Sequence, residues 1–467
     1  MQRVLLTALT ITPTMHTPTF TRRVIDALLL GAAIAPAARA QQSSRPPLRA
    51  LGPALATSEP MGAVAAVQAL PGGRLLVNDP LKRRVVLLDS SLKQLAVVAD
   101  TTPATKNAYG PRNGGLIPFR GDSALFVDAN SLSMLVIDPA GKIARIMAAP
   151  RANDVFFLLG GPMGNPGFDA KGRLVYRSMG FGDRRVAPAP GQPFTPPVLP
   201  DSVPIVRYDL TARKLDTAAF VKVYAPKFNV VQSEGGGMRM STFINPIPEV
   251  DDWAVLPDGT IAIVRKDYHV DFVDAVGQRT SAPKIPFDWQ RLTDSAKVAI
   301  IDSSKAAFER MRAGGPGAGP GGAPMIVAQV GPGGPPPGAG PGGGGMIMMR
   351  ERGPEGGAPP SRGAAPSAAA AGPPPVAFVS PSELPDYRPA FSNGSVRADA
   401  DGKLWVRILS PKPASGPEYD VIDKTGKLVD RVVLPAGTTI AGFGAAGTVY
   451  LGVRDASGVH VVRAREK

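Results

Sequence analysis

The stretch Val250–Gly277, with the sequence VDDWAVLPDGTIAIVRKDYHVDFVDAVG, decides the fold. Short apolar segments in it are separated by polar turns: Trp253–Leu256, Thr260–Val264 and Val270–Val273. The first turn is Pro257-Asp258-Gly259, and Gly277 marks the last one. Strand-length apolar runs joined by Asp-Gly turns are typical of antiparallel hairpins. The stretch therefore predicts a set of short antiparallel strands.

The same unit recurs along the chain. Its turns centre on positions 72, 122, 172, 259, 402 and 447, and the first three are fifty residues apart. A period near fifty with about four strands per repeat indicates a β-propeller, whose blades bury their apolar faces against one another. We therefore expect an all-β fold, a six-bladed β-propeller of four-stranded antiparallel blades over residues 48–464. Residues 51–58 are expected to supply the outer strand that the short last repeat lacks.

Residues 1–40 have the pattern of an export signal. A basic region, an apolar core and a cleavage motif follow one another: Arg22-Arg23, Leu28–Ala35 and Ala38-Arg39-Ala40. The apolar run is too short to span a bilayer. Translation starts at Met1 or at Met15, which precedes a complete signal. We expect a periplasmic or extracellular protein that begins at Gln41, with a flexible segment over residues 41–47 and no transmembrane segment.

Three insertions interrupt the repeats. Residues 183–204 are rich in proline, and residues 292–312 carry apolar side chains at helical spacing after a capping Thr293 or Asp294. Residues 313–375 contain 20 Gly and 15 Pro among 63 residues. Such a composition cannot form a packed core, so we expect this last insertion to be disordered.

Charge and cysteine content limit the classes of function. The formal net charge is +14, and removal of residues 1–40, with four Arg and one Asp, lowers it to +11. A basic surface favours anionic envelope polymers as partners, although charge says nothing of the fold. The absence of cysteine excludes disulfides, thiolate metal sites, cysteine nucleophiles and a lipoprotein anchor.

The repeated strand–turn–strand units resemble those of the bacterial six-bladed β-propellers of the NHL-like group. The resemblance is carried by Leu256–Ile261 and Ala400–Val406, and by Leu384–Pro389 ahead of the fifth unit. It covers most of residues 48–464 apart from the insertions. Because propellers serve as lyases, lactonases, receptors and scaffolds, the resemblance implies a fold and leaves the function open. Lactonase-type and amidating-lyase-type members imply a divalent cation in the central channel.

The expected mature chain offers little for catalysis. It has two histidines, His269 and His460, which argues against a histidine-ligated zinc centre and leaves few options for a Ser-His-Asp triad. The motifs of phosphate-binding loops, zinc proteases and EF-hands are missing. We therefore expect no cofactor, with Ca²⁺ as the one possibility, and no specific binding of nucleic acid.

What remains is a ring of polar residues where the second strand of each repeat passes to the third. Its oxygen-bearing members suit a hard cation such as Ca²⁺: Asn78, Asp79, Asp128 and Asn130. Its other members, with the loops beside them, suit an anionic or carboxylate-bearing ligand: Arg112, Asn113, Arg177, Arg265, His269 and Arg407. The competing interpretation is that the Asn and Asp side chains cap turns and the arginines are solvated.

Three hypotheses of function follow. The first is an exported, non-catalytic binding or scaffold module that holds a protein, peptide, small-molecule or envelope ligand on its loop face. The alternative is a Ca²⁺-dependent hydrolase or lyase of the lactonase-like kind. A third, anchoring to anionic envelope polymers, rests on the charge alone.

Overall fold

The computed structural model divides into residues 1–44 and the compact unit 45–467, and only the second is described below. The described residues are 45–101, 109–110, 113–178, 199–232, 238–313, 377–410 and 416–466. Residues 183–198 of the predicted insertion 183–204 and residues 314–375 of the predicted insertion 313–375 therefore lie outside them, as do Arg112 and residues 1–44. Ser202 instead begins a strand, and Ala313 ends the helix.

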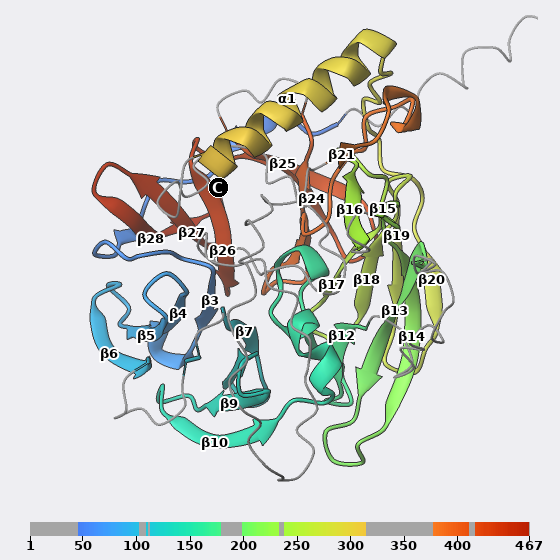
Figure 1. The fold of residues 1–467 in the computed structure, drawn as a ribbon. Coiled ribbons are helices and arrows are strands. Elements are labelled where there is room, and N and C mark those ends of the chain that lie inside the picture. The colour runs from blue at the N-terminus through green and yellow to red at the C-terminus, as the bar shows by residue number, and fades with distance from the viewer. Residues whose placement is uncertain are drawn as a thin grey trace, which may run out of the picture. The chain divides into compact units, whose positions relative to one another are not determined.

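Six antiparallel sheets form the blades of a β-propeller (Figure 1). Blade 1 contains β3 (Ala66–Ala69), β4 (Leu75–Asp79), β5 (Arg84–Leu88) and β6 (Gln94–Ala99). Blade 2 contains β7 (Gly115–Pro118), β8 (Ala124–Asp128), β9 (Ser133–Ile137) and β10 (Ile143–Ala148). Blade 3 contains β11 (Gly167–Phe168), β12 (Leu174–Arg177), β13 (Ser202–Tyr208) and β14 (Leu215–Lys222). Blade 4 contains β17 (Asp252–Val255), β18 (Ile261–Val264), β19 (Val270–Val273) and β20 (Arg279–Ser281). Blade 5 contains β22 (Val396–Ala398), β23 (Leu404–Ile408), β24 (Glu418–Ile422) and β25 (Leu428–Val433). Blade 6 contains β26 (Thr438–Gly444), β27 (Thr448–Asp455), β28 (Gly458–Arg465) and β2 (Ala56–Thr57). The six-bladed propeller expected from the sequence is confirmed.

The first strands of neighbouring blades contact one another along most of the ring. β26 contacts β3, β3 contacts β7, β7 contacts β11, β11 contacts β17, and β17 contacts β22. Each blade thus runs outward from its first strand, and the last strand is at its rim. The ring is closed by β2, which pairs antiparallel with β28 through Ala56↔Arg463 and Thr57↔Val462. Residues near the N-terminus therefore complete blade 6, as the sequence predicted.

The Asp-Gly turns allow the blades to pack closely. In the turn of blade 4, Gly259 has a φ of +85°, which an L side chain adopts only with strain. A Cβ added there would also lie 2.2 Å from the backbone nitrogen of Ala170, in the equivalent turn of blade 3. Glycine is thus required at position 259 both by its own conformation and by the neighbouring blade.

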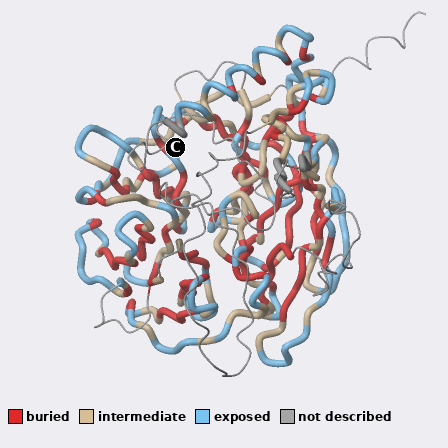
Figure 2. Tube along the Cα trace, viewed as in Figure 1, coloured by how far each residue is buried: buried red, intermediate tan, exposed pale blue. Residues whose placement is uncertain are grey.

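The apolar strand residues form the contacts between blades. Every residue of β4 and β8 is buried, because each middle strand is covered on both faces. Figure 2 shows the buried segments along the strands and the exposed ones at rims and turns. Trp253 and Trp405 are fully buried, which confirms them as packing residues, whereas Trp289 is 42% exposed and contacts Phe287 edge-on.

A helix and a small sheet lie outside the six blades. They are formed by the segments that connect blade 3 to blade 4 and blade 4 to blade 5 in the sequence. The expected helix is confirmed as α1 (Asp294–Ala313). A sheet that the sequence did not predict, with the order β15-β16-β21, contains β15 (Phe228–Gln232), β16 (Met238–Ile244) and β21 (Ala377–Phe378). Leu292, Ile301 and Leu384 belong to an apolar core of their own here. The chain returns to the propeller through β22.

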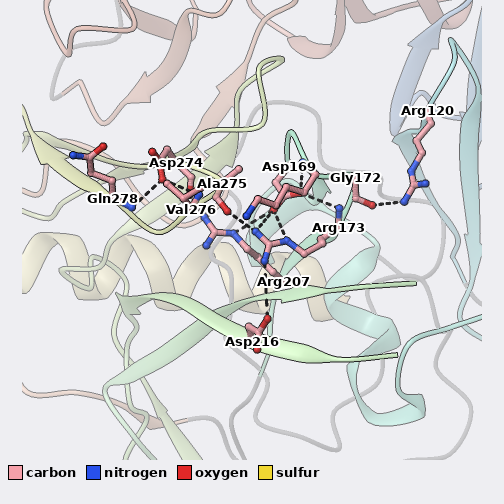
Figure 3. A network of polar contacts seen from close by, with 11 residues as sticks. Arg120, Asp169, Gly172, Arg173, Arg207, Asp216, Asp274, Ala275, Val276 and Gln278 are labelled. Carbon is pink, nitrogen blue, oxygen red and sulfur yellow. Dashed lines mark hydrogen bonds and ion pairs between the residues drawn. The ribbon is translucent and has the colours of Figure 1, made fainter. Parts of the chain in front are cut away.

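Arginines link successive blades at the face where first strands turn into second strands, which we call the turn face (Figure 3). Arg120 of blade 2 donates to the carbonyl of Gly172 in blade 3, and Arg173 of blade 3 donates to the carbonyl of Ala275 in blade 4 at 2.6 Å. Asp169 accepts from Arg173 Nε at 2.8 Å and also faces Arg207, which donates to the carbonyl of Asp274. These bonds hold three blades in sequence.

Candidate functional site

The predicted site residues lie at the opposite face from the turns, which we call the connection face. Antiparallel pairing brings the ends of second strands and the starts of first strands to this one edge. The described candidates are all at or beside it: Asn78, Asp79, Asn113, Asp128, Asn130, Arg177, Arg265, His269 and Arg407. They do not form one cluster, because most of them bond to groups beside their own strand, and Arg177 interacts instead with Asp252 of blade 4.

Asn78 and Asp79 are buried and hydrogen-bonded within the protein. The Asn78 amide donates to the carbonyl of Gly114 at 2.8 Å and accepts from the hydroxyl of Tyr109 at 3.0 Å. The Asp79 carboxylate accepts from the backbone N–H groups of Gly62 and Ala63, and from Arg84 and the N–H of Lys82 in its own turn. Both side chains tie blade 1 to the chain around it.

Asp128 ends β8 in blade 2, and Asn130 lies in the turn that follows. The Asp128 carboxylate accepts from the backbone N–H groups of Asn130 and Ser131 and from the Ser131 hydroxyl. The Asn130 side chain is exposed. No group of three or more acidic or histidine side chains in the described part of the chain is placed to hold a metal ion. The Ca²⁺ site therefore stays a prediction, and the side-chain oxygens of Asn78, Asp79 and Asp128 already accept protein donors.

Arg265 and His269 are enclosed by carboxylates in blade 4. Arg265 donates to Asp271 at 2.7 Å and to Asp251 at 2.9 Å. Burial lowers the pKa of Arg265, but these two partners outweigh it and raise the pKa. His269 Nδ1 lies 2.7 Å from Asp267, and its Nε2 lies 3.3 Å from Asp271. This network fixes the second turn of blade 4.

Arg177 is different, because it is buried without a carboxylate in contact. It ends β12, is 5% exposed, and lies over the Phe157 ring with its Nη2 3.0 Å from the Met163 sulfur. Its Nε is buried and has no hydrogen-bond partner among the described residues. Burial lowers the pKa of Arg177 to about 10, an effect that the charge of Asp252 partly offsets. An N–H of a cation thus faces the interior without an acceptor.

Asp252 begins β17 and is 2% exposed. It accepts a hydrogen bond of 2.8 Å from the backbone N–H of Val396, at the start of β22. Burial raises the pKa of Asp252 to about 7, although backbone donors and the charge of Arg177 oppose this rise. The carboxyl therefore changes protonation near neutral pH.

Arg397 follows Val396 in β22 and is half-buried. Burial lowers its pKa, against attraction to Tyr419 and Asp252. Its guanidinium has no hydrogen-bond or ion-pair partner in the described ranges. Arg177 of blade 3 and Arg397 of blade 5 are each attracted by Asp252 of blade 4, and we call these three residues the arginine cluster.

The connection from blade 2 to blade 3 covers this region. It contains η3 (Ala152–Leu158) and η4 (Gly161–Met163), drawn in teal near the middle of Figure 1. Asn165 donates from its amide to the carbonyl of Val396 at 2.6 Å, and the backbone of Gly161 lies against Gly394. The connection between blades 2 and 3 therefore borders the arginine cluster.

Sequence analysis found one of the three members. Arg177 was predicted as a ligand-binding residue, whereas Asp252 and Arg397 were missed. They occur at the starts of first strands, whereas most of the predicted site residues lie where a second strand passes to a third. Two features of the sequence could have indicated them: the pair of acidic residues ahead of Trp253, and the arginine after Ser395-Val396. Arg407, which was predicted, is exposed, and its backbone N–H donates to the carbonyl of Ser395 at 3.0 Å.

Comparisons with known proteins give likenesses of fold. No family model matches the chain, and no curated protein matches it significantly. Virginiamycin B lyase from Staphylococcus aureus is 10% identical, with 87% of this chain and 96% of that chain covered and a TM-score of 0.33. A Bacteroides fragilis protein described as exported is 9% identical over 91% and 96%, with a TM-score of 0.41. A protein described as a gluconolactonase is 10% identical over 91% and 98%, with a TM-score of 0.37.

At these identities and TM-scores the likenesses carry no argument about activity. The propeller rests on the strand topology of this chain itself. Within the described part of the chain, no helix has the length and apolar character needed to cross a membrane.

Proposed function

We propose that this protein is a binding module that holds a carboxylate-bearing ligand at the arginine cluster on its connection face. The observation that carries the proposal is the Arg177 Nε, a buried donor without an acceptor among the described residues. Buried polar groups are nearly always hydrogen-bonded, because an unpaired one costs about 1–3 kcal/mol. A ligand oxygen at this position removes that cost.

A carboxylate is the ligand group that suits the cluster best. Two guanidinium groups can each donate parallel N–H bonds to a carboxylate, which gives affinity and orientation together. Arg397 is half-buried, so it provides an approach to Arg177 from the surface. The ligand then lies between blades 3 and 5, above the start of β17.

Asp252 makes this binding depend on pH. When protonated, it is neutral and its O–H can donate to a ligand oxygen; when ionised, it repels a carboxylate. Its pKa is raised to about 7 by burial. Affinity is therefore high below pH 7 and falls as the pH rises through that value.

The ligand is proposed to be met outside the cytoplasm, as the export pattern of residues 1–40 predicts. The sequence-based alternative, a Ca²⁺-dependent hydrolase or lyase, has no observation in its favour that the binding proposal lacks. The candidate oxygens of Asp79 and Asp128 are bonded to backbone N–H groups.

Calorimetric titration with a panel of N-acetylated dipeptides, as free acids and as C-terminal amides, tests the proposal. We expect the acids to bind at pH 6 at least tenfold more tightly than the amides, because a charge-assisted bond contributes about 1.5–3 kcal/mol. Arg397→Gln should weaken the binding of the acids about tenfold. Arg407→Gln, an exposed arginine of the same face, is the matched control and should leave it unchanged. Equal affinity for acids and amides contradicts the proposal.

A further inference from the structure

The first described residues run along the rim of blade 5. We call residues 45–50 the strap. Its strand β1 (Leu48–Ala50) pairs parallel with β25, through Leu48↔Arg431, Arg49↔Val432 and Ala50↔Val433. The other four strands of this blade form an antiparallel meander, so the strap is an addition from a distant part of the chain. This arrangement is that of a peptide that extends a sheet at its free edge.

Arg45 anchors the strap in a pocket between blades 4 and 5. Its guanidinium donates to both oxygens of Asp420, at 3.2 and 3.1 Å, and to Asp288 at 3.0 Å. It also lies 5.2 Å from the centroid of the Phe287 ring. The Asp420 side chain is 1% exposed, so Arg45 reaches a buried charge. Burial on an aromatic face and pairing with a buried carboxylate are the strongest settings for an arginine contact.

A second arginine fixes the register of the strap. Arg49 forms a two-pronged ion pair with Asp430 of β25. Arg45 and Arg49 are four residues apart and contact carboxylates on β24 and β25. The two contacts together select an extended segment with this spacing, while the backbone pairing supplies affinity without regard to sequence.

The pocket is held in shape by residues other than the strap. Asp420 also accepts from the Tyr268 hydroxyl at 2.7 Å and from Arg431 Nε at 3.3 Å. The Phe287 ring is held edge-on between Tyr268 and Trp289, with centroids 5.2 and 5.1 Å away. Removal of Arg45 therefore leaves a carboxylate with two partners and a supported aromatic wall. A site that keeps its form without its occupant can take another one.

We propose that the rim of blade 5 is a recognition site for an extended basic peptide with arginines four residues apart, occupied here by the strap of the chain itself. The peptide pairs with β25 in parallel, its first arginine enters the pocket of Asp420 and Phe287, and its second meets Asp430. Ring closure does not depend on this site, because β2 alone completes blade 6.

A chain that begins at Leu51 tests the proposal, since it lacks the strap and keeps β2. The probe is a fluorescently labelled peptide of residues 41–50, QQSSRPPLRA. We expect anisotropy to show saturable binding and the peptide to raise the Tm of the shortened chain. An Arg45→Ala peptide should bind at least tenfold more weakly, and an Asp430→Asn protein should lose the preference for arginine at position 49.

A folded shortened chain, with a cooperative melt, that does not bind the peptide overturns the proposal. Equal binding of the Arg45→Ala peptide overturns it as well. If the shortened chain does not fold, the intact protein with Arg45→Ala and Arg49→Ala takes its place, because its own strap is weakened. That variant should bind the labelled peptide in trans, and its failure to do so overturns the proposal.

Discussion

Asp252 shows how one residue connects position in the fold with chemistry. It begins the innermost strand of blade 4, where Val396 of blade 5 donates to it, so it is buried by its own blade and the next. Burial therefore destabilises its charged form, and its pKa is raised to about 7. The same residue in an exposed turn, such as Asp258, only caps a backbone N–H.

The raised pKa predicts how stability depends on pH. Asp252 binds a proton more tightly in the folded state than in the unfolded state. Its contribution to the free energy of unfolding is therefore fully present below pH 4 and is lost as the pH rises to 7. A shift from 3.8 to about 7 corresponds to a loss on the order of 4 kcal/mol.

Asp252→Asn should remove this dependence. Urea unfolding at pH 4.5 and pH 7.5 measures it: the unfolding free energy of the wild type should fall relative to the variant between the two pH values. Asp258→Asn, an exposed carboxyl of the same blade, is the control and should follow the wild type. If Asp252→Asn also follows the wild type, Asp252 does not titrate in this range.

At the scale of an element, β2 closes the ring with few residues. Beside it, the Ser58 hydroxyl accepts from the backbone N–H of Val461 at 2.9 Å, and the Ser58 carbonyl lies 2.9 Å from His460 Nδ1. Because Ser58 is 6% exposed, Ser58→Ala leaves a buried N–H without that acceptor. We expect a loss of about 1–2 kcal/mol in unfolding free energy by urea denaturation. Ser91→Ala, in an exposed turn, should cost less than 0.5 kcal/mol, as surface changes usually do.

Elements with a turn signal were predictable, and the others were not. Strands flanked by Asp-Gly or Gly-Lys turns, such as β18 and β23, were located to within one or two residues, since the turn fixes both neighbours. The strands β15, β16 and β21 have no such turns, and β21 pairs in parallel across the long insertion. For the same reason the strap could not be predicted: its partner β25 is distant in sequence.

For the site residues, too, the sequence predicted one property and missed another. The sequence identified Arg177 because it follows an apolar strand, but burial, which makes Arg177 differ from exposed Arg407, comes from η4 and Phe157. Asp79 and Asp128 proved to be hydrogen-bonded to nearby backbone N–H groups. Spacing thus predicts which face a residue occupies, while tertiary packing decides what the residue can bind.

At the scale of the whole molecule, bonds at the turn face join neighbouring blades at equivalent repeat positions. Arg74 donates to the carbonyl of Pro139 in blade 2 at 2.7 Å, and Arg173 donates to that of Ala275 in blade 4 at 2.6 Å. In blade 5, Lys403 pairs with Glu466, after the last strand, at 2.8 Å. Each basic residue follows the turn of its blade, so one sequence position serves the same purpose in three repeats.

Independent links of this kind predict additive losses. Arg74→Ala removes two bonds to carbonyls of blade 2, one of them part-buried, and a third to Pro71 in its own turn, and should cost about 1 kcal/mol. Arg173→Ala also deprives the buried Asp169 of a partner and should cost about 2–4 kcal/mol. Because the two links join different pairs of blades, urea unfolding of the double variant should show the sum within about 0.5 kcal/mol. Lys171→Ala, an exposed residue beside Arg173, is the control. A double variant that loses much more than the sum would show that the links cooperate around the ring.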